Sequence, residues 1–123
     1  MEPTKSELEI LQVLWEHGPQ TVRFVNDKLN EEKRAVQYSS TLKLMQIMFD
    51  KGILLRDESS MKHIYRPAEA EDKTKHALLN RFVDSMYKGS ASSLVMQLFG
   101  SKKTTAEELK EIKDFLNNLD QQS

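Results

Sequence analysis

The stretch RAVQYSSTLKLMQIMFDKG, residues 34–52, decides the fold because it joins a helical apolar repeat to a run of hydroxyl groups. On a helical wheel, one side holds the core candidates Thr41, Leu44, Met45 and Met48. The opposite side is a polar ridge of Ser39, Lys43, Gln46 and Asp50. The stretch therefore predicts a helix that buries one side, presents the other outward, and ends at Lys51-Gly52.

Two helices are predicted before this stretch and a hairpin after it. A T-x-x-E capping box at Thr4 and Glu7 begins the first helix, and Gly18-Pro19 ends it. The second runs from about residue 21 to 30, and the polar segment 31–36 is predicted to be a loop. Short strands at 53–56 and 63–67 flank a polar turn. This order is typical of a winged helix-turn-helix, so residues 1–68 predict a mainly α fold with a small β-hairpin.

Residues 69–123 are expected to form a three-helix dimerisation region. The first helix covers about residues 71–87, the second ends at Gly100, and the third begins near residues 104–105. Such short amphipathic helices pack either against the winged helix or against a second copy, and we favour a homodimer. The predicted dimerisation residues are Leu78, Phe82, Met86, Leu94, Leu98, Leu109, Ile112, Leu116 and Leu119.

Charge is distributed unevenly along the chain, although the net charge of −1 is not typical of a nucleic-acid binder. Residues 33–66 contain 7 Lys and Arg against 3 Asp and Glu, whereas residues 1–32 contain 3 against 7. A local positive excess attracts phosphate backbones, although chance clustering explains an excess of this size as well.

The absence of cysteine excludes disulfides and thiolate metal sites, and this fits a reducing compartment. There is no apolar run of the roughly 20 residues that span a bilayer, and the N-terminus lacks the order of a signal peptide. We therefore expect a cytoplasmic protein without direct membrane association.

Sequence patterns of enzymes and metal sites are missing. His17, His63 and His76 are far apart in the chain and have no metal-ligand spacing. The four glycines form neither a G-x-S-x-G elbow nor a phosphate-binding loop. The sequence thus predicts a protein that is not an enzyme and uses no metal or cofactor.

The start of the third predicted helix suits DNA. Free backbone N–H groups and the positive end of the helix dipole favour a phosphate oxygen, and the hydroxyls at 39–41 add donors. The ridge side chains can meet base edges in a major groove. The alternative is that Ser39 or Ser40 only caps the helix and the ridge faces solvent; the chemistry alone leaves both possibilities open.

Three segments resemble the penicillinase-repressor family, the repressors of β-lactam resistance operons. They are TKSELEILQVLWEHGPQTVRFV, YSSTLKLMQIMFDKGIL and MYKGSASSLVMQLF, which lie in the family's order and cover almost the whole chain. The matching motifs are residues 9–15, the Y-T-T-V-like start at residues 38–41, and Lys51-Gly52. Ile47 departs from the family because some members carry a basic residue there.

The resemblance implies a homodimeric repressor whose third helix enters the major groove of operator DNA while the hairpin touches the backbone. Carried over to this sequence, the DNA-facing residues are Tyr38, Ser39, Ser40, Lys43 and Gln46. On the hairpin, Arg56, Lys62 and Arg66 would contact phosphates, with Arg34 as a secondary candidate.

The family's repressors are released when a membrane sensor metalloprotease cuts the short helix after the S-L-V segment. In this chain Gln97-Leu98 replaces the usual Asn-Phe at the cut. Two other readings stay open: a winged helix used for protein–protein assembly without specific DNA binding, with the acidic first helix as docking face, and a small-molecule sensor with a pocket between the C-terminal helices.

Overall fold

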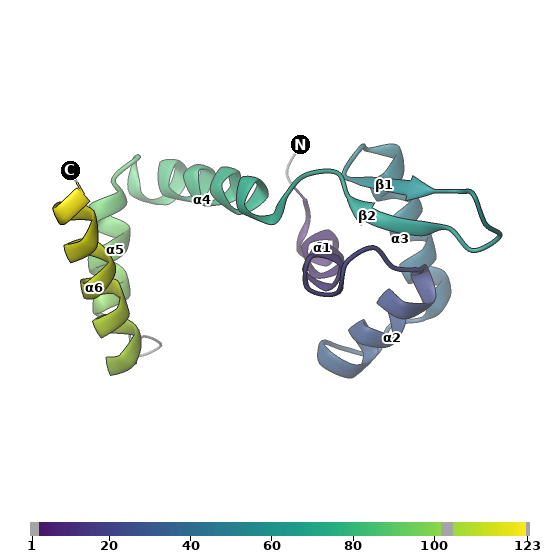
Figure 1. Cartoon of the computed structure of the whole chain (residues 1–123), viewed down its shortest axis with the longest axis horizontal. Coiled ribbons are helices and arrows are strands. Elements are labelled where there is room, and N and C mark those ends of the chain that lie inside the picture. Colours follow the sequence, from purple (N-terminus) through teal and green to yellow (C-terminus); the bar gives the residue numbers. More distant parts are fainter. Residues whose placement is uncertain (1–2, 102–104, 123) are drawn as a thin grey trace. The chain divides into compact units, whose positions relative to one another are not determined.

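The computed structural model describes residues 3–101 and 105–122, with the side chains of 116 and 118–122 left out (Figure 1). The chain forms two compact units, Met1–His76 and Ala77–Ser123. The first contains α1 (Lys5–His17), α2 (Val22–Glu32), α3 (Tyr38–Asp50), β1 (Leu54–Asp57) and β2 (Ile64–Pro67). The chain continues with α4 (Glu71–Tyr87), α5 (Ala91–Phe99) and α6 (Ala106–Gln122). The predicted mainly helical fold with one hairpin is confirmed.

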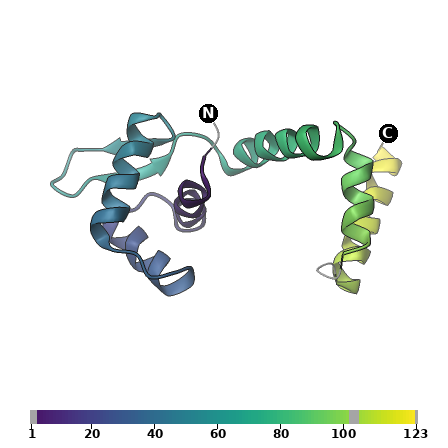
Figure 2. The ribbon, with the colours of Figure 1, turned by 180° about the vertical axis from the view of Figure 1, so that it is seen from behind.

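The core of the first unit lies between its three helices and the hairpin, which the two opposite views show gathered together (Figures 1 and 2). The predicted inner side of α3 is confirmed, because Thr41, Met45 and Met48 are buried and Leu44 is half-buried. The buried apolar side chains of this core are Ile10, Leu11, Val13, Leu14, Val22, Val25, Leu29, Met45, Met48, Leu54 and Tyr65.

The hairpin is antiparallel and has one buried face. Leu55 pairs with Arg66 and both are exposed, whereas Arg56 pairs with the buried Tyr65. Tyr65 also exchanges two backbone hydrogen bonds with Gln20, at N–O distances of 3.0 and 2.9 Å. The connection between α1 and α2 is thus tied to β2, a contact that the sequence did not predict.

Two asparagines of α2 hold the connection to α3. Asn26 is buried, and its Nδ2 donates to Thr41 Oγ1 at 2.8 Å and to the Val36 carbonyl at 3.1 Å. Asn30 Nδ2 donates to the same carbonyl at 3.0 Å, and Asn30 Oδ1 accepts from Val36 N at 3.1 Å. These bonds fix how α3 leaves α2, which extends two residues beyond the predicted end near Asn30.

The N-terminus of α1 is bound to the end of α3. Thr4 and Glu7 form the predicted capping box, and Lys51 Nζ donates to Glu7 Oε2 at 2.9 Å. Burial raises the pKa of the Glu7 carboxyl, but hydrogen bonds from Thr4 and Lys51 outweigh burial and hold that pKa below its ordinary value. Glu7 is therefore a buried anion that joins two helices.

The second unit begins inside α4, whose bounds match the predicted 71–87. Gly89, in the left-handed region at φ 82°, ends this helix, and Ser90 caps α5 by accepting from Ser93 N at 3.2 Å. Thr105 caps α6 in the same way, accepting from Glu108 N at 3.1 Å. In both views α5 and α6 lie side by side (Figures 1 and 2). Within residues 3–101 and 105–122, none of the helices has the length and apolar character needed to cross a bilayer.

Candidate nucleic-acid interface

One side of α3 faces solvent along its whole length. Its exposed residues are Ser39, Ser40, Lys43, Gln46, Ile47 and Asp50. This stripe contains the predicted polar ridge, and the core contacts of Met45 and Met48 on the other side hold it in place. Donors, acceptors and one aliphatic side chain are thereby presented on a rigid rod, which is the form in which proteins read a major groove.

The N-terminus of α3 differs from those of α1, α2 and α5. Those helices are capped by side chains of Thr4, Thr21 and Ser90, whereas Gln37 at the N-cap of α3 makes no side-chain capping bond. Neither Ser39 nor Ser40 occupies the capping position, so the alternative that they only cap the helix does not hold. The Ser40 amide donates to the Gln37 carbonyl at 3.1 Å, and no side-chain cap accepts from the first turn of α3.

Tyr38 is held in place by a residue that the sequence analysis missed. The guanidinium carbon of Arg23, in the first turn of α2, lies 4.0 Å above the centroid of the Tyr38 ring. Arg23 is exposed and Tyr38 half-buried. An arginine in the first turn of the preceding helix was the available signal, but the contact crosses two helices and has no sequence spacing to reveal it.

A groove of about 430 Å³ runs between α2, α3 and the hairpin. It brings together three predicted residues, Tyr38, Gln46 and Lys62, with two that were not predicted, Arg23 and the fully exposed Met61. The groove is lined by Thr21, Val22, Arg23, Tyr38, Leu42, Gln46, Met61, Lys62, His63 and Tyr65. The start of α3 and the hairpin turn thus border one continuous surface.

Arg56 already makes contacts within its own unit. Its guanidinium donates to Glu58 Oε2 at 2.7 and 2.9 Å and lies 4.0 Å from the Phe49 ring centroid. Hydrogen bonds to the Tyr65 hydroxyl and to Glu58 raise the pKa of Arg56, and the hydrogen bond from Arg56 lowers the pKa of the Glu58 carboxyl. A phosphate would have to compete with Glu58 for this cation.

The other basic candidates are separated. Lys62 is exposed in the hairpin turn, and Arg66 is exposed on the hairpin face opposite to Arg56. Arg34 forms an ion pair with Glu9 and also donates to Ser6 Oγ at 3.4 Å. On α1, Glu7 and Glu9 are in ion pairs with Lys51 and Arg34, whereas Glu16 is exposed.

The predicted dimerisation residues are incompletely covered within one chain. Phe82, Met86 and Leu98 are 45%, 65% and 44% exposed. Half-buried members of the set are Leu78, Leu94, Leu109 and Ile112, while the side chains of Leu116 and Leu119 lie outside the described residues. Among the side chains described in residues 77–123, Val83 alone is buried.

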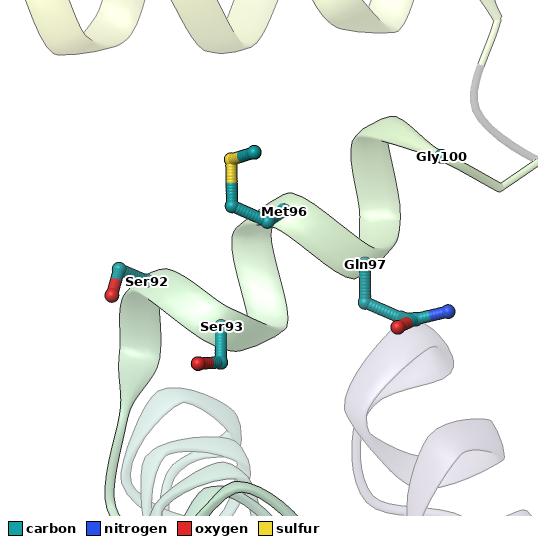
Figure 3. A pocket seen from close by; sticks show the side chains of 5 residues that line it. All are labelled: Ser92, Ser93, Met96, Gln97 and Gly100. Carbon is teal, nitrogen blue, oxygen red and sulfur yellow. The ribbon is translucent and has the colours of Figure 1, made fainter.

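The predicted cleavage position lies in the last turn of α5, where Gln97 and Leu98 are exposed. An open hollow of about 400 Å³ on this helix is lined by Ser92, Ser93, Met96, Gln97 and Gly100. Met96 and Gln97 project from different sides of the helix (Figure 3). The described residues that line this hollow lie on α5 and at its C-cap. Over the described ranges, no group of three His, Asp or Glu side chains is arranged to hold a metal ion.

The family model and the similar proteins each match nearly the whole of this chain. The family model for the penicillinase repressor matches residues 3–118. A penicillinase repressor of Staphylococcus aureus is 22% identical over 120 residues, covering 97% of this chain and 94% of that protein. One of Bacillus licheniformis is 26% identical over 116 residues, covering 90% and 86%. A MarR family protein from Bacillus stearothermophilus shares the fold, with a TM-score of 0.51 and 22% identity over 97% of this chain and 74% of that one.

Proposed function

This chain belongs to the penicillinase repressor family, and from this premise we propose that it is a homodimeric repressor that occludes a two-fold symmetric operator. The family consists of winged-helix transcriptional repressors rather than enzymes. The observation that carries the proposal is the solvent-facing ridge of α3, whose uncapped start adjoins the groove with Arg23 and Lys62. The protein would act in the cytoplasm, where the operator is.

The chemistry of the surface assigns different tasks to its residues. Lys43 and Gln46 have the hydrogen-bonding groups that distinguish base edges, lysine for guanine and glutamine for adenine. Ser39, Ser40 and the first amides of α3 suit one phosphate. Lys62 extends the contact to the backbone beside the hairpin, and Arg66 is a further phosphate candidate on its other face.

A second copy of the chain would bury the exposed apolar side chains of the C-terminal helices. Among the described side chains of α4, α5 and α6, six large apolar ones are exposed: Leu79, Phe82, Met86, Met96, Leu98 and Phe115. Apolar surface of this extent rarely stays uncovered in a stable protein. Pairing of two such regions buries these side chains and places two α3 helices under one two-fold axis, as a dyad operator requires.

The test of DNA binding compares single lysine variants on a duplex selected by the wild-type protein from a random-sequence library. We expect Lys43→Ala to weaken binding to this duplex by about 1–3 kcal/mol and to relax the sequence preference of the protein. Lys62→Ala should weaken binding to all sequences alike, and it should lower the slope of log K against log salt concentration by about 1. Lys75→Ala is the matched control, because Lys75 pairs with Glu71 beside a different hollow. Unchanged binding in both test variants would remove the assignments.

The test of dimerisation is sedimentation equilibrium. Replacing Phe82 and Met86 together by Asp should give a monomer, and its operator affinity should fall on the order of 100-fold because the second half-site is lost. Leu55→Asp is the control, since Leu55 is 38% exposed in the first unit. A variant that remains dimeric would exclude this face as the interface.

Release would follow from cutting the bond between Gln97 and Leu98, which separates α6 from the rest of the dimerisation region. The bond lies in the final turn of a helix, where local unwinding is least costly, and a membrane sensor metalloprotease is the expected partner. Mass spectrometry of the chain from induced cells should find a fragment ending at Gln97. Recovery of only the intact chain under inducing conditions would refute this step.

A further inference from the structure

Ile47 is the one apolar side chain on the exposed stripe of α3. It is 38% exposed, and Lys43 precedes it by one helical turn while Asp50 follows it by nearly one. Gln46, next to it in sequence, is also exposed. The core beneath α3 is filled by Met45 and Met48, both 0% exposed, so Ile47 is not required to complete it. An aliphatic side chain thus stands in the middle of a polar surface.

The major groove offers such a side chain a single kind of apolar partner. Apart from small C–H groups, its floor carries hydrogen-bond donors and acceptors, and the C5-methyl of thymine is the one apolar group that projects from it. We propose that Ile47 is a specificity-determining residue that contacts a thymine methyl, so that each half-site carries a T·A pair opposite the C-terminal half of α3. This inference rests on the proposed binding of DNA through α3.

The same contact discriminates against the other bases. A cytosine at this position has only a hydrogen at C5, so the apolar contact with Ile47 is lost, and its amino group replaces the O4 acceptor of thymine. The exposed neighbours Lys43 and Gln46 supply hydrogen bonds only to adjacent base pairs. Ile47 therefore selects by an apolar contact, while its neighbours select by hydrogen bonds.

The decisive experiment removes only the methyl group from the DNA. In the duplex selected by the full-length wild-type protein, thymines are replaced by deoxyuridine at one symmetric pair of positions at a time. At one pair of positions we expect the affinity to fall about fourfold per half-site, or about 16-fold for the dimer, because each half-site loses one buried methyl group. Ile47→Ala should bind the thymine duplex more weakly and should not distinguish it from that deoxyuridine duplex.

Leu55→Ala is the matched control, because Leu55 has the same 38% exposure but lies on the outer face of the hairpin. It should keep the full sensitivity to deoxyuridine. A selected duplex without thymine in its half-sites, no loss at any position, or equal sensitivity in Ile47→Ala would overturn the assignment while sequence-specific binding persists. Absence of any sequence-specific binding would instead overturn the proposed function, and the assignment with it.

Discussion

The buried hydrogen bond between Asn26 and Thr41 joins α2 to α3, and its removal tests how much this contact contributes to the stability of the first unit. The two side chains are 5% and 1% exposed, and Nδ2 donates to Oγ1 at 2.8 Å. We consider Asn26→Ala, which removes the donor, Thr41→Val, which keeps the shape but removes the hydroxyl, and the double variant.

The structure indicates the size of each effect. In Asn26→Ala the Val36 carbonyl keeps its bond from Asn30 Nδ2 at 3.0 Å, so the loss falls on the Thr41 hydroxyl and on packing. A buried polar group without a partner costs about 1–3 kcal/mol, and a net hydrogen bond contributes about 1 kcal/mol. Each single variant should therefore lower the free energy of unfolding by about 1–3 kcal/mol, with a coupling of about 1 kcal/mol in the double-mutant cycle.

Urea unfolding followed by fluorescence measures this coupling. Trp15, the single tryptophan, lies on α1 and reports on the first unit, and the protein concentration is held constant because dimers gain stability with concentration. Thr41→Ser is the control: it keeps the hydroxyl, so Asn26→Ala should cost the same in this background as in the wild type. Additive effects of Asn26→Ala and Thr41→Val would show that the bond contributes nothing.

Three further predictions concern the first unit. Because the pKa of Glu7 is lowered on folding, the stability that its carboxylate contributes is present above the ordinary value of 4.5 and is lost as the pH falls through the folded-state pKa; in acid titrations of Tm, Glu7→Gln should therefore show a flatter decline than the wild type. Arg56→Lys should lower Tm in the absence of DNA, since lysine lacks the planar group that stacks on Phe49, and it should leave the salt slope of DNA binding unchanged. Gly52→Ala should cost about 1 kcal/mol in urea unfolding through its φ of +81° alone, because an added Cβ meets no atom within 4 Å, and Gly52→Asn should cost less.

Elements with a strong helical period and a clear stop were predicted well. The bounds of α4 match, and the inner side of α3 follows the wheel, because packing of one stripe against a core enforces the same period in sequence and structure. The end of α2 was placed too early because the residues 31 and 32 are charged and have no apolar signal. The bridge between Gln20 and Tyr65 was missed, since a single residue pair has no alternation to detect.

The exposed site was predicted less completely than the fold. Arg23 was missed because its contact with Tyr38 joins two helices. Arg56 was predicted as a phosphate contact and Arg34 as a secondary candidate, and a count of charges could not reveal their ion pairs with Glu58 and Glu9. Whether any of these residues contacts DNA stays a prediction.

In the proposed complex, the charges along α3 also limit how much DNA one subunit can read. Glu7 and Glu9 are held in ion pairs with Lys51 and Arg34, whereas Asp50 is exposed at the C-terminal end of the ridge. A carboxylate there repels phosphate, so the contact has to end before it. From Ser39 to Ile47 the helix rises about 12 Å at 1.5 Å per residue, which corresponds to three or four base pairs at about 3.4 Å each. Lys43 and Ile47 both fall inside this length. A half-site of that size therefore accommodates both the hydrogen bonds of Lys43 and the apolar contact of Ile47.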